Sequence, residues 1–180
     1  RSLTDINRVD SKLFEPFDYF VPVESLPLRL GATPSDLPAP PYLSCHDRKV
    51  QAMKSKFKGG QPLLGICWRN HEVDGVDQAE VQYKEQMNSV DLESLEWHLK
   101  ELSMDYDLVS FQPGLRFEER EILSRCGCRV IEEDSFSDFS VIAEMMLCLD
   151  TMITVDSPIA HLAGALGVDA HVLLPFASDW

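Results

Sequence analysis

A short predicted helix near the carboxyl end of the sequence holds the side chains whose types and spacing could do chemistry. Ser157 can cap this helix, Pro158 suits its first position, and Gly167 can end it. A helix that begins where a strand ends presents free N–H groups and the positive end of its dipole, and both favour an anion. Ser157 and His161 are four residues apart and share one face, which Gly164 extends without a side chain. This arrangement would suit a diphosphate.

The residues of this helix allow two other interpretations. Small residues such as Ala160 and Ala163 could serve only to pack the helix closely on a sheet, with His161 as a hydrogen-bonded bystander. A hydrolase built on Asp156, Ser157 and His161 is disfavoured, because the sequence has no Gly-x-Ser-x-Gly elbow and one helical turn cannot place a base and its orienting group. The packing interpretation stays open beside the diphosphate site.

Polar residues also follow the other predicted strands. After the first strand, Arg69 could supply a fixed positive charge to a phosphate, and Asn70 or His71 a hydrogen-bond donor; the alternative is a solvated loop. After the second strand, Gln112 could contact a base or a ribose, and a plain turn is equally open. Since ligands of open α/β sheets bind beyond the carboxyl ends of the strands, these positions are candidates for a shared site.

The acidic residues give weaker signals. Asp105 and Asp107 match the D-x-D pattern of a metal–diphosphate site, but they precede their strand and so lie at the wrong edge of the sheet. The acidic run 132–134 follows the third strand and could accept hydrogen bonds from a ribose, although such runs are usually solvated. Residues 72–89 form a long acidic connection of the length that is usually functional or mobile. No metal site is predicted.

Composition excludes several classes of function. Sixteen Lys and Arg against 30 Asp and Glu give a net charge of −14, which disfavours nucleic acid as a partner. The apolar runs are far shorter than the roughly 20 residues of a membrane-spanning helix. The five cysteines are odd in number and Cys126-Gly127-Cys128 lacks redox or zinc spacing, so we expect reduced thiols in a cytoplasmic protein and no bound metal.

The elements that must position these residues alternate regularly. Strands are expected at 63–68, 106–111, 128–131, 151–155 and 170–174, with helices at 46–58, 92–103, 116–125, 137–149 and 158–166. Short apolar strands separated by helices of about ten residues indicate right-handed crossovers and a parallel sheet covered on both faces. The predicted fold class is α/β, a Rossmann-like parallel five-stranded sheet. Trp97 and His98 are expected on a core or half-buried helix face.

The amino-terminal part has a different character. It contains most of the prolines, with a β-like run at 17–23 and one helical turn at 24–30. We therefore expect residues 1–45 to be a linker arm and residues 46–180 a Rossmann-like domain. The chain begins with Arg1 and stops at Trp180 soon after its last apolar run, so we expect a fragment whose domain is truncated at its carboxyl end.

Several segments together resemble a known family. They are residues 155–167 followed by 172–180, which are the most specific, and 25–31, 38–43, 64–68 and 109–112. They are similar to the carboxyl-terminal, nucleotide-sugar-binding half of GT-B glycosyltransferases. The nearest group is the glycosyltransferase-like domain of bacterial tetratricopeptide-repeat proteins, related to heptosyltransferases and O-GlcNAc transferases. The resemblance covers most of residues 17–180.

The resemblance implies a site and an activity. The donor's diphosphate would lie on the helix start, and the site would include Asp156, Ser157, Pro158, Ile159, Ala160, His161, Gly164, Asn70 and Gln112. Arg69 and His161 would be the catalytic candidates, stabilising the nucleoside diphosphate as it leaves, without a metal or other cofactor. The acceptor is unknown, and its base would come from an amino-terminal domain that this sequence lacks.

We therefore expect a glycosyltransferase fragment that binds a nucleotide diphosphate-sugar but does not transfer the sugar alone. The alternative is a catalytically inactive GT-B-like module acting in protein–protein interaction. An NAD enzyme is disfavoured because no Gly-x-Gly-x-x-Gly follows the first strand. An isolated half would expose its cleft face, so self-association as a homodimer is expected.

Overall fold

The computed structural model of the chain describes residues 19–57, 59–70 and 89–175. It divides into two units, residues 1–39 and residues 40–180. In the described part of the first unit, η3 (Val23–Ser25), α1 (Leu26–Leu30) and η4 (Pro34–Asp36) are short helices. Residues 19–22, in the predicted β-like run, form no strand and lead directly into η3. The acidic residues 72–88 and His71 lie outside the described residues.

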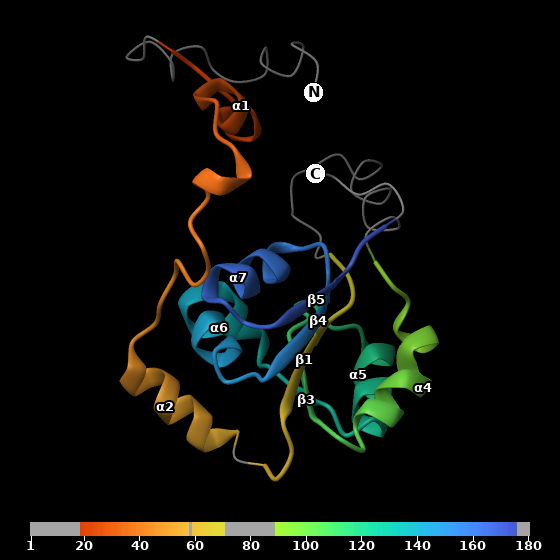
Figure 1. Ribbon diagram of the computed structural model, residues 1–180. Helices are drawn as coiled ribbons and strands as arrows, with labels where there is room; N and C mark the ends of the chain where they lie inside the picture. Colours follow the sequence, from red (N-terminus) through yellow and green to blue (C-terminus); the bar gives the residue numbers. More distant parts are fainter. Residues whose placement is uncertain (1–18, 58, 71–88, 176–180) are drawn as a thin grey trace. The chain divides into compact units, whose positions relative to one another are not determined.

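The second unit is built on a five-stranded sheet in which every strand pairing is parallel (Figure 1). The spatial order is β3-β2-β1-β4-β5, so the strand order reverses between β1 and β4. The strands are β1 (Leu63–Cys67), β2 (Asp107–Ser110), β3 (Arg129–Val130), β4 (Thr151–Val155) and β5 (Ala170–Leu173). This confirms the predicted Rossmann-like α/β fold.

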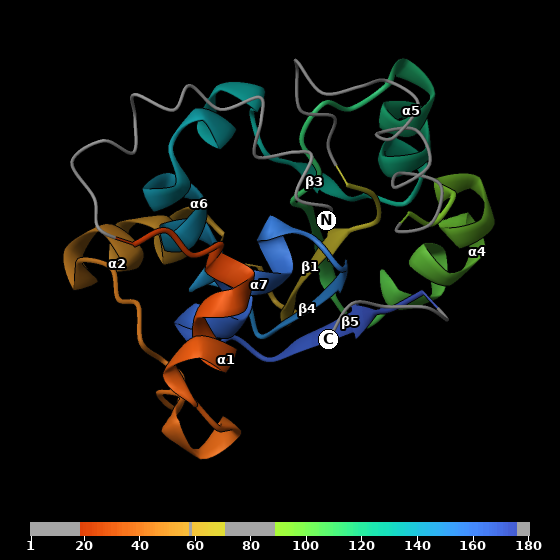
Figure 2. The ribbon, with the colours of Figure 1, turned by 90° about the horizontal axis from the view of Figure 1, so that it is seen from above.

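Helices cover both faces of this sheet (Figures 1 and 2). One face carries α4 (Leu92–Leu102) and α5 (Phe117–Arg125), and the other carries α2 (Asp47–Lys56), α6 (Phe139–Met146) and α7 (Pro158–Leu166). Each helix–sheet interface has its own apolar cluster. Leu64, Ile66 and Leu123 belong to the first, and Phe111 and Met152 to the second. Because side chains alternate along a strand, β1 contributes to both clusters and is buried throughout.

One predicted helix is in fact two elements. The sequence pattern predicted a single helix at 137–149, whereas the structure has the 3-10 helix η5 (Glu133–Ser137) followed by α6. Asp138 separates them in an extended conformation, with φ −129° and ψ 106°, and its Oδ1 accepts a hydrogen bond from Ser140 N at 2.8 Å. An aspartate that caps the next helix competes with continuation of the previous one, so the break follows from local hydrogen bonding.

Helix α7 begins and ends where the sequence predicted. Gly167 ends it in the left-handed region, with φ 72° and ψ 24°. The chain returns to this end of the helix from a distant segment, since Tyr42 N and Leu43 N both donate to Ala165 O, at 2.9 and 3.0 Å. Pro41 lies beside Gly167. Residues 40–43, which were predicted as part of the arm, are therefore fastened to the unit that contains the sheet.

The two glycines of this region should respond in opposite ways to alanine. At Gly164, an added Cβ meets nothing within 4 Å, so Gly164→Ala is expected to raise the free energy of unfolding by about 0.5–1 kcal/mol. At Gly167, the positive φ and Pro41 atoms at 3.3–3.4 Å oppose a Cβ, so Gly167→Ala should lower it by about 1–2 kcal/mol. Urea unfolding of both variants checks this; equal effects would contradict the assigned backbone geometry.

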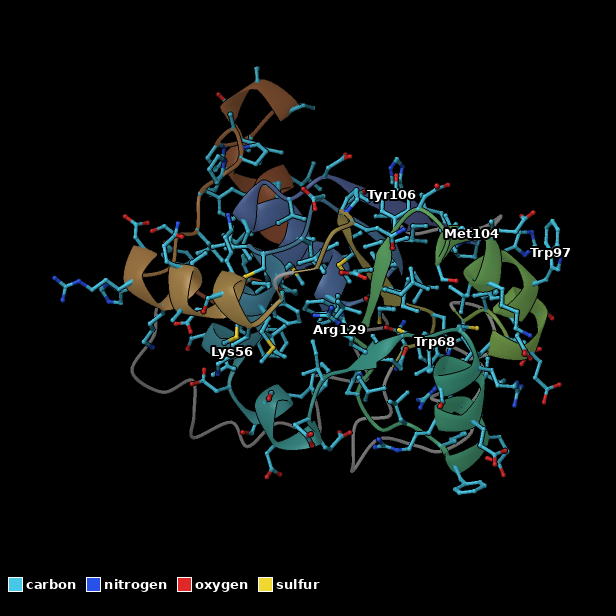
Figure 3. The ribbon with its side chains drawn as sticks, turned by 90° about the horizontal axis from the view of Figure 1, so that it is seen from below. Lys56, Trp68, Trp97, Met104, Tyr106 and Arg129 are labelled. Carbon is cyan, nitrogen blue, oxygen red and sulfur yellow. The ribbon has the colours of Figure 1, made fainter. Side chains whose placement is uncertain are left out.

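The outer face of α4 differs from its prediction. Trp97 is 62% exposed and projects away from the helix (Figure 3), and His98 is exposed beside it, with ring centroids 5.0 Å apart and an interplanar angle of 82°. The expectation of a half-buried face was wrong because Leu92 and Leu99 supply the face that packs on the sheet. None of the helices in the described part of the chain has the length and apolar character of a membrane span.

Candidate functional site

The segments that follow β1, β2, β3 and β4 enclose one pocket at the carboxyl edge of the sheet. Its volume is about 380 Å³, near the lower end of the range for small-molecule sites, about 300–1,000 Å³. The pocket spans the reversal of strand order between β1 and β4, which is where open α/β sheets bind ligands. Its lining residues are Cys67, Arg69, Asn70, Pro113, Glu133, Phe136, Ser137, Phe139, Ser157, Pro158 and Ile159.

The start of α7 forms one wall of this pocket. Ser157 is buried, and its Oγ accepts a hydrogen bond from Ala160 N at 3.4 Å and lies 3.3 Å from Thr154 Oγ1. Pro158 has no N–H to offer. Among the first three residues of the helix, Ile159 therefore has the one N–H group without a partner in the described part of the chain. The predicted cap at Ser157 is confirmed, and the hydroxyl is committed to it.

The sequence predicted that Ser157, His161 and Gly164 share one face of α7, but only Ser157 lines the pocket. Ser157 lies in the pocket wall, whereas the His161 side chain is 83% exposed and is not among the lining residues. The His161 Nε2 atom lies 3.8 Å from Asp156 Oδ1, and Gly164 is exposed. The structure therefore does not bring His161 and Gly164 into the pocket with Ser157.

Asn70 connects the two loops on either side of the reversal point. Its Nδ2 donates to Asp156 O at 3.0 Å, which ties the loop after β1 to the loop after β4. The side chain also lines the pocket. Asn70 thus holds in place the segment from which α7 begins, whatever else it contacts.

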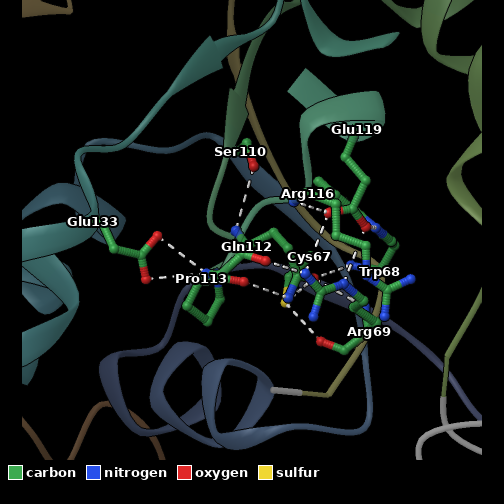
Figure 4. Close-up of polar contacts among 10 residues, drawn as sticks. Cys67, Trp68, Arg69, Ser110, Gln112, Pro113, Arg116, Glu119 and Glu133 are labelled. Atoms are coloured by element: carbon green, nitrogen blue, oxygen red, sulfur yellow. Dashed lines mark hydrogen bonds and ion pairs between the residues drawn. The ribbon is translucent and has the colours of Figure 1, made fainter. Parts of the chain in front are cut away.

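The buried side chain of Gln112 accepts hydrogen bonds from the two residues that follow β1 (Figure 4). The side chain is 1% exposed, and its Oε1 accepts hydrogen bonds from Arg69 N at 3.0 Å and Trp68 N at 3.2 Å. Its Nε2 donates to Pro113 O at 3.2 Å. Gln112 is not among the pocket residues, and its carboxamide is engaged by the protein itself. Its hydrogen bonds hold Trp68 and Arg69, the two residues that follow β1, in place.

Arg69 is held by a carboxylate that sequence reasoning did not single out. Its Nε lies 3.0 Å from Glu119 Oε1, its second Nη lies 3.2 Å from Glu119 Oε2, and that Nη also donates to Gly114 O. Glu119 further accepts from Trp68 Nε1 at 3.0 Å and from Arg116 N at 2.7 Å (Figure 4). Both charged side chains are 10% exposed, so this is a buried, fork-shaped ion pair.

Burial and hydrogen bonding set the protonation of two groups near the pocket. Burial would raise the pKa of Glu119, but the hydrogen bonds from Arg69, Arg116 N and Trp68 outweigh it and hold the pKa below its ordinary value. Glu119 therefore stays charged at neutral pH. Burial raises the pKa of Cys67 to about 11, so this lining residue is a neutral thiol and a poor nucleophile.

Glu133 comes from the acidic run that follows β3. Its two carboxylate oxygens accept from Gly114 N at 3.0 and 3.1 Å (Figure 4). The side chain also lines the pocket.

The pocket also has two aromatic lining residues, Phe136 and Phe139, which the sequence analysis did not identify. They also follow β3, and two phenylalanines within an otherwise polar segment after a strand were the available signal. The D-x-D carboxylate Asp107 lies away from the pocket and pairs with Arg129 at 3.4 Å.

The described residues contain no group of three or more side chains suited to hold a metal ion. The cysteines are all unpaired thiols, and four of the five are buried.

A second pocket, of about 520 Å³, lies between the starts of α4 and α5 and is lined by charged groups of both signs, among them Glu93, Arg116 and Glu118.

The fold has known counterparts. ADP-heptose LPS heptosyltransferase II of E. coli superposes with a TM-score of 0.56 at 19% identity, over 78% of this chain and 42% of that enzyme. A family 9 glycosyl transferase from Veillonella parvula DSM 2008 superposes with a TM-score of 0.58 at 16% identity, over 89% of this chain and 47% of that protein. No protein-family model and no curated protein matches the sequence.

These similarities define a class of fold. The chain has the Rossmann-like architecture of one half of a GT-B glycosyltransferase, which confirms the expected fold. It spans less than half the length of each of the two structures. At these identities the likeness is one of fold.

Proposed function

We propose that the chain is the carboxyl-terminal, donor-binding half of a glycosyltransferase related to heptosyltransferases and to the glycosyltransferase-like domains of tetratricopeptide-repeat proteins. The observation that carries the proposal is the pocket at the strand-order reversal, on a fold shared with family 9 glycosyltransferases. Its ligand is a nucleotide diphosphate-sugar.

The residues of the pocket suggest how such a donor would lie. Phe136 and Phe139 offer faces on which a base can stack, and the free lone pairs of Glu133 can accept from ribose hydroxyls. The diphosphate would lie at Ile159 N, at the positive end of the α7 dipole. In this placement the nucleoside occupies the pocket and the sugar points out of it.

The two catalytic candidates then have different positions. Arg69 acts as a positioning residue, because its guanidinium holds the loop after β1 through Glu119 and Gly114 O. His161 lies in solvent one turn into α7, where it can meet a leaving diphosphate only from outside the pocket. Departure of the nucleoside diphosphate would be helped chiefly by the helix dipole, and the acceptor would be deprotonated by a group on another domain.

A second candidate function is favoured by one observation. Arg69 is the single cation among the described residues that line the pocket, and Glu119 already neutralises it. A GT-B-like module that has lost donor binding and acts in protein–protein interaction would have such a site. Indifference to every nucleotide together with one tight protein partner would favour this alternative.

Binding to the pocket can be tested with two matched phenylalanines. Phe139 and Phe117 are the first residues of α6 and α5, are 53% and 71% exposed, and differ in that Phe139 alone lines the pocket. Stacking of a base on an aromatic ring contributes about 1–3 kcal/mol, so Phe139→Ala should weaken donor binding about tenfold or more. Phe117→Ala should leave it unchanged.

The measurement is a thermal-shift and calorimetric titration with ADP, UDP, GDP and their sugar conjugates. Ligand at about 100 times the dissociation constant should stabilise the wild type by about 2.7 kcal/mol. If no nucleotide raises the melting temperature of the wild type, or if both alanine variants lose binding equally, donor binding in this pocket is refuted.

A further inference from the structure

The charge of the pocket does not match a diphosphate. Among the described residues that line it, Arg69 is the one cationic side chain, and Glu119 faces it with both carboxylate oxygens at 3.0 and 3.2 Å. Glu133 adds an uncompensated negative charge to the wall. The charges of Arg69, Glu119 and Glu133 therefore sum to −1. A nucleoside diphosphate is itself negatively charged, so the net charge of these groups repels it.

The start of α7 compensates little of this charge. Pro158 lacks an N–H, and Ala160 N donates to Ser157 Oγ. A helix start acts on an anion through its free amides and a partial charge of about +0.5, which is less than the full charge of Glu133. Asp156, beside the helix start, places a second carboxylate within reach of His161, which is its one ion-pair partner in the described part of the chain.

The rest of the pocket suits an uncharged, flat ligand. The segments that follow β2, β3 and β4 supply the apolar lining residues Pro113, Phe136, Phe139, Pro158 and Ile159. The neutral thiol of Cys67 adds to it. Aromatic and proline faces bind a base through its apolar surface, and this interaction does not depend on the phosphate.

We propose that affinity in this pocket resides in the uncharged nucleoside, and that the diphosphate adds none. The inference rests on the proposed function and deepens it, because it names the part of the donor that the site recognises. The pocket then binds a nucleoside about as tightly as the corresponding nucleoside diphosphate, because repulsion from Glu133 offsets what the phosphates gain at Ile159 N.

The test compares matched ligand pairs by calorimetry on the full chain: adenosine with ADP, uridine with UDP and guanosine with GDP. For the base that binds, the two dissociation constants should agree within about threefold. Lowering the salt concentration should weaken the diphosphate relative to the nucleoside, because less screening strengthens repulsion from Glu133.

Glu133→Gln supplies the internal check. It removes the charge while keeping an oxygen for Gly114 N, so diphosphate affinity should rise about fivefold relative to that of the nucleoside. The ratio of the two affinities cancels any loss of ribose contacts. Glu118 is also an exposed glutamate but lies outside this pocket, so Glu118→Gln should leave the ratio unchanged.

Two results would overturn the inference, and they are distinguishable. A diphosphate that binds about thirtyfold or more tightly than its nucleoside refutes it and leaves the proposed function standing. Failure of every nucleoside and every diphosphate to bind removes the proposed function, and the inference with it.

Discussion

Glu119→Ala is expected to lower the free energy of unfolding by about 3–5 kcal/mol, the range for breaking a buried ion pair from one side. The variant leaves the Arg69 guanidinium, at 10% exposure, without a counter-charge, and it removes the acceptor of Trp68 Nε1 and Arg116 N. Since a domain of this size is stabilised by roughly 5–15 kcal/mol in all, the loss should be visible as a large shift of the urea midpoint.

Glu118→Ala is the matched control. Glu118 precedes Glu119 in the first turn of α5 but is exposed, so its removal should change stability by less than about 0.5 kcal/mol. If the two variants unfold at the same urea concentration, the Arg69–Glu119 pair does not hold the loop after β1 in solution.

The same carboxylate should make stability depend on pH. The pKa of Glu119 is lower in the folded chain than the value of about 4.3 for an unperturbed glutamate. Its contribution is therefore complete above that value and is lost as the pH falls through the lowered, folded-state pKa. Wild type should lose stability over this acidic range by more than Glu119→Ala does.

Gln112→Met should have the next largest effect, a loss of about 2–4 kcal/mol. Methionine has a similar length but no carboxamide, so two buried backbone amides, Trp68 N and Arg69 N, lose their acceptor. Each unsatisfied buried donor costs about 1–3 kcal/mol. Chemical denaturation measures the loss. Gln51→Met, at an exposed position of α2, is the control with little expected change.

This variant also separates two roles for Gln112. If Gln112 holds the residues after β1 in place, Gln112→Met should lower stability and weaken the binding of every ligand, because Arg69 and Asn70 would both shift. A direct contact to a base or ribose predicts unchanged stability and a change in base preference. The second outcome would restore the interpretation of Gln112 as a donor-binding residue.

Regular elements could be predicted because their signals are local. The helix start at Ser157-Pro158 and its end at Gly167 depend on backbone preferences of single residues, and both were located correctly. Strands were recognised as short apolar runs because both faces of a parallel sheet are covered. The helix predicted at 137–149 was not a single element, since an amphipathic pattern does not record that Asp138 caps a new one.

The site was harder to predict because its partners are distant in sequence. Arg69 and Glu119 are 50 positions apart, and Gln112 and Arg69 are 43 apart. From the sequence, Arg69 after the first strand is a candidate phosphate ligand. Only the fold shows that Glu119 lies against it and pairs with it. Spacing likewise placed Ser157 and His161 on one helix face, but it could not show that the pocket lies against only the first turn.

Helix α7 joins two attachment points. Its first residue lies in the pocket wall, and near its last turn Ala165 O receives the amides of Tyr42 and Leu43. A nine-residue helix is about 13 Å long and resists axial compression, because each turn is closed by hydrogen bonds. A force applied to residues 40–43 would therefore be transmitted along the helix to Pro158. We therefore expect a displacement of residues 40–43 to be accompanied by a displacement of Pro158 in the pocket wall.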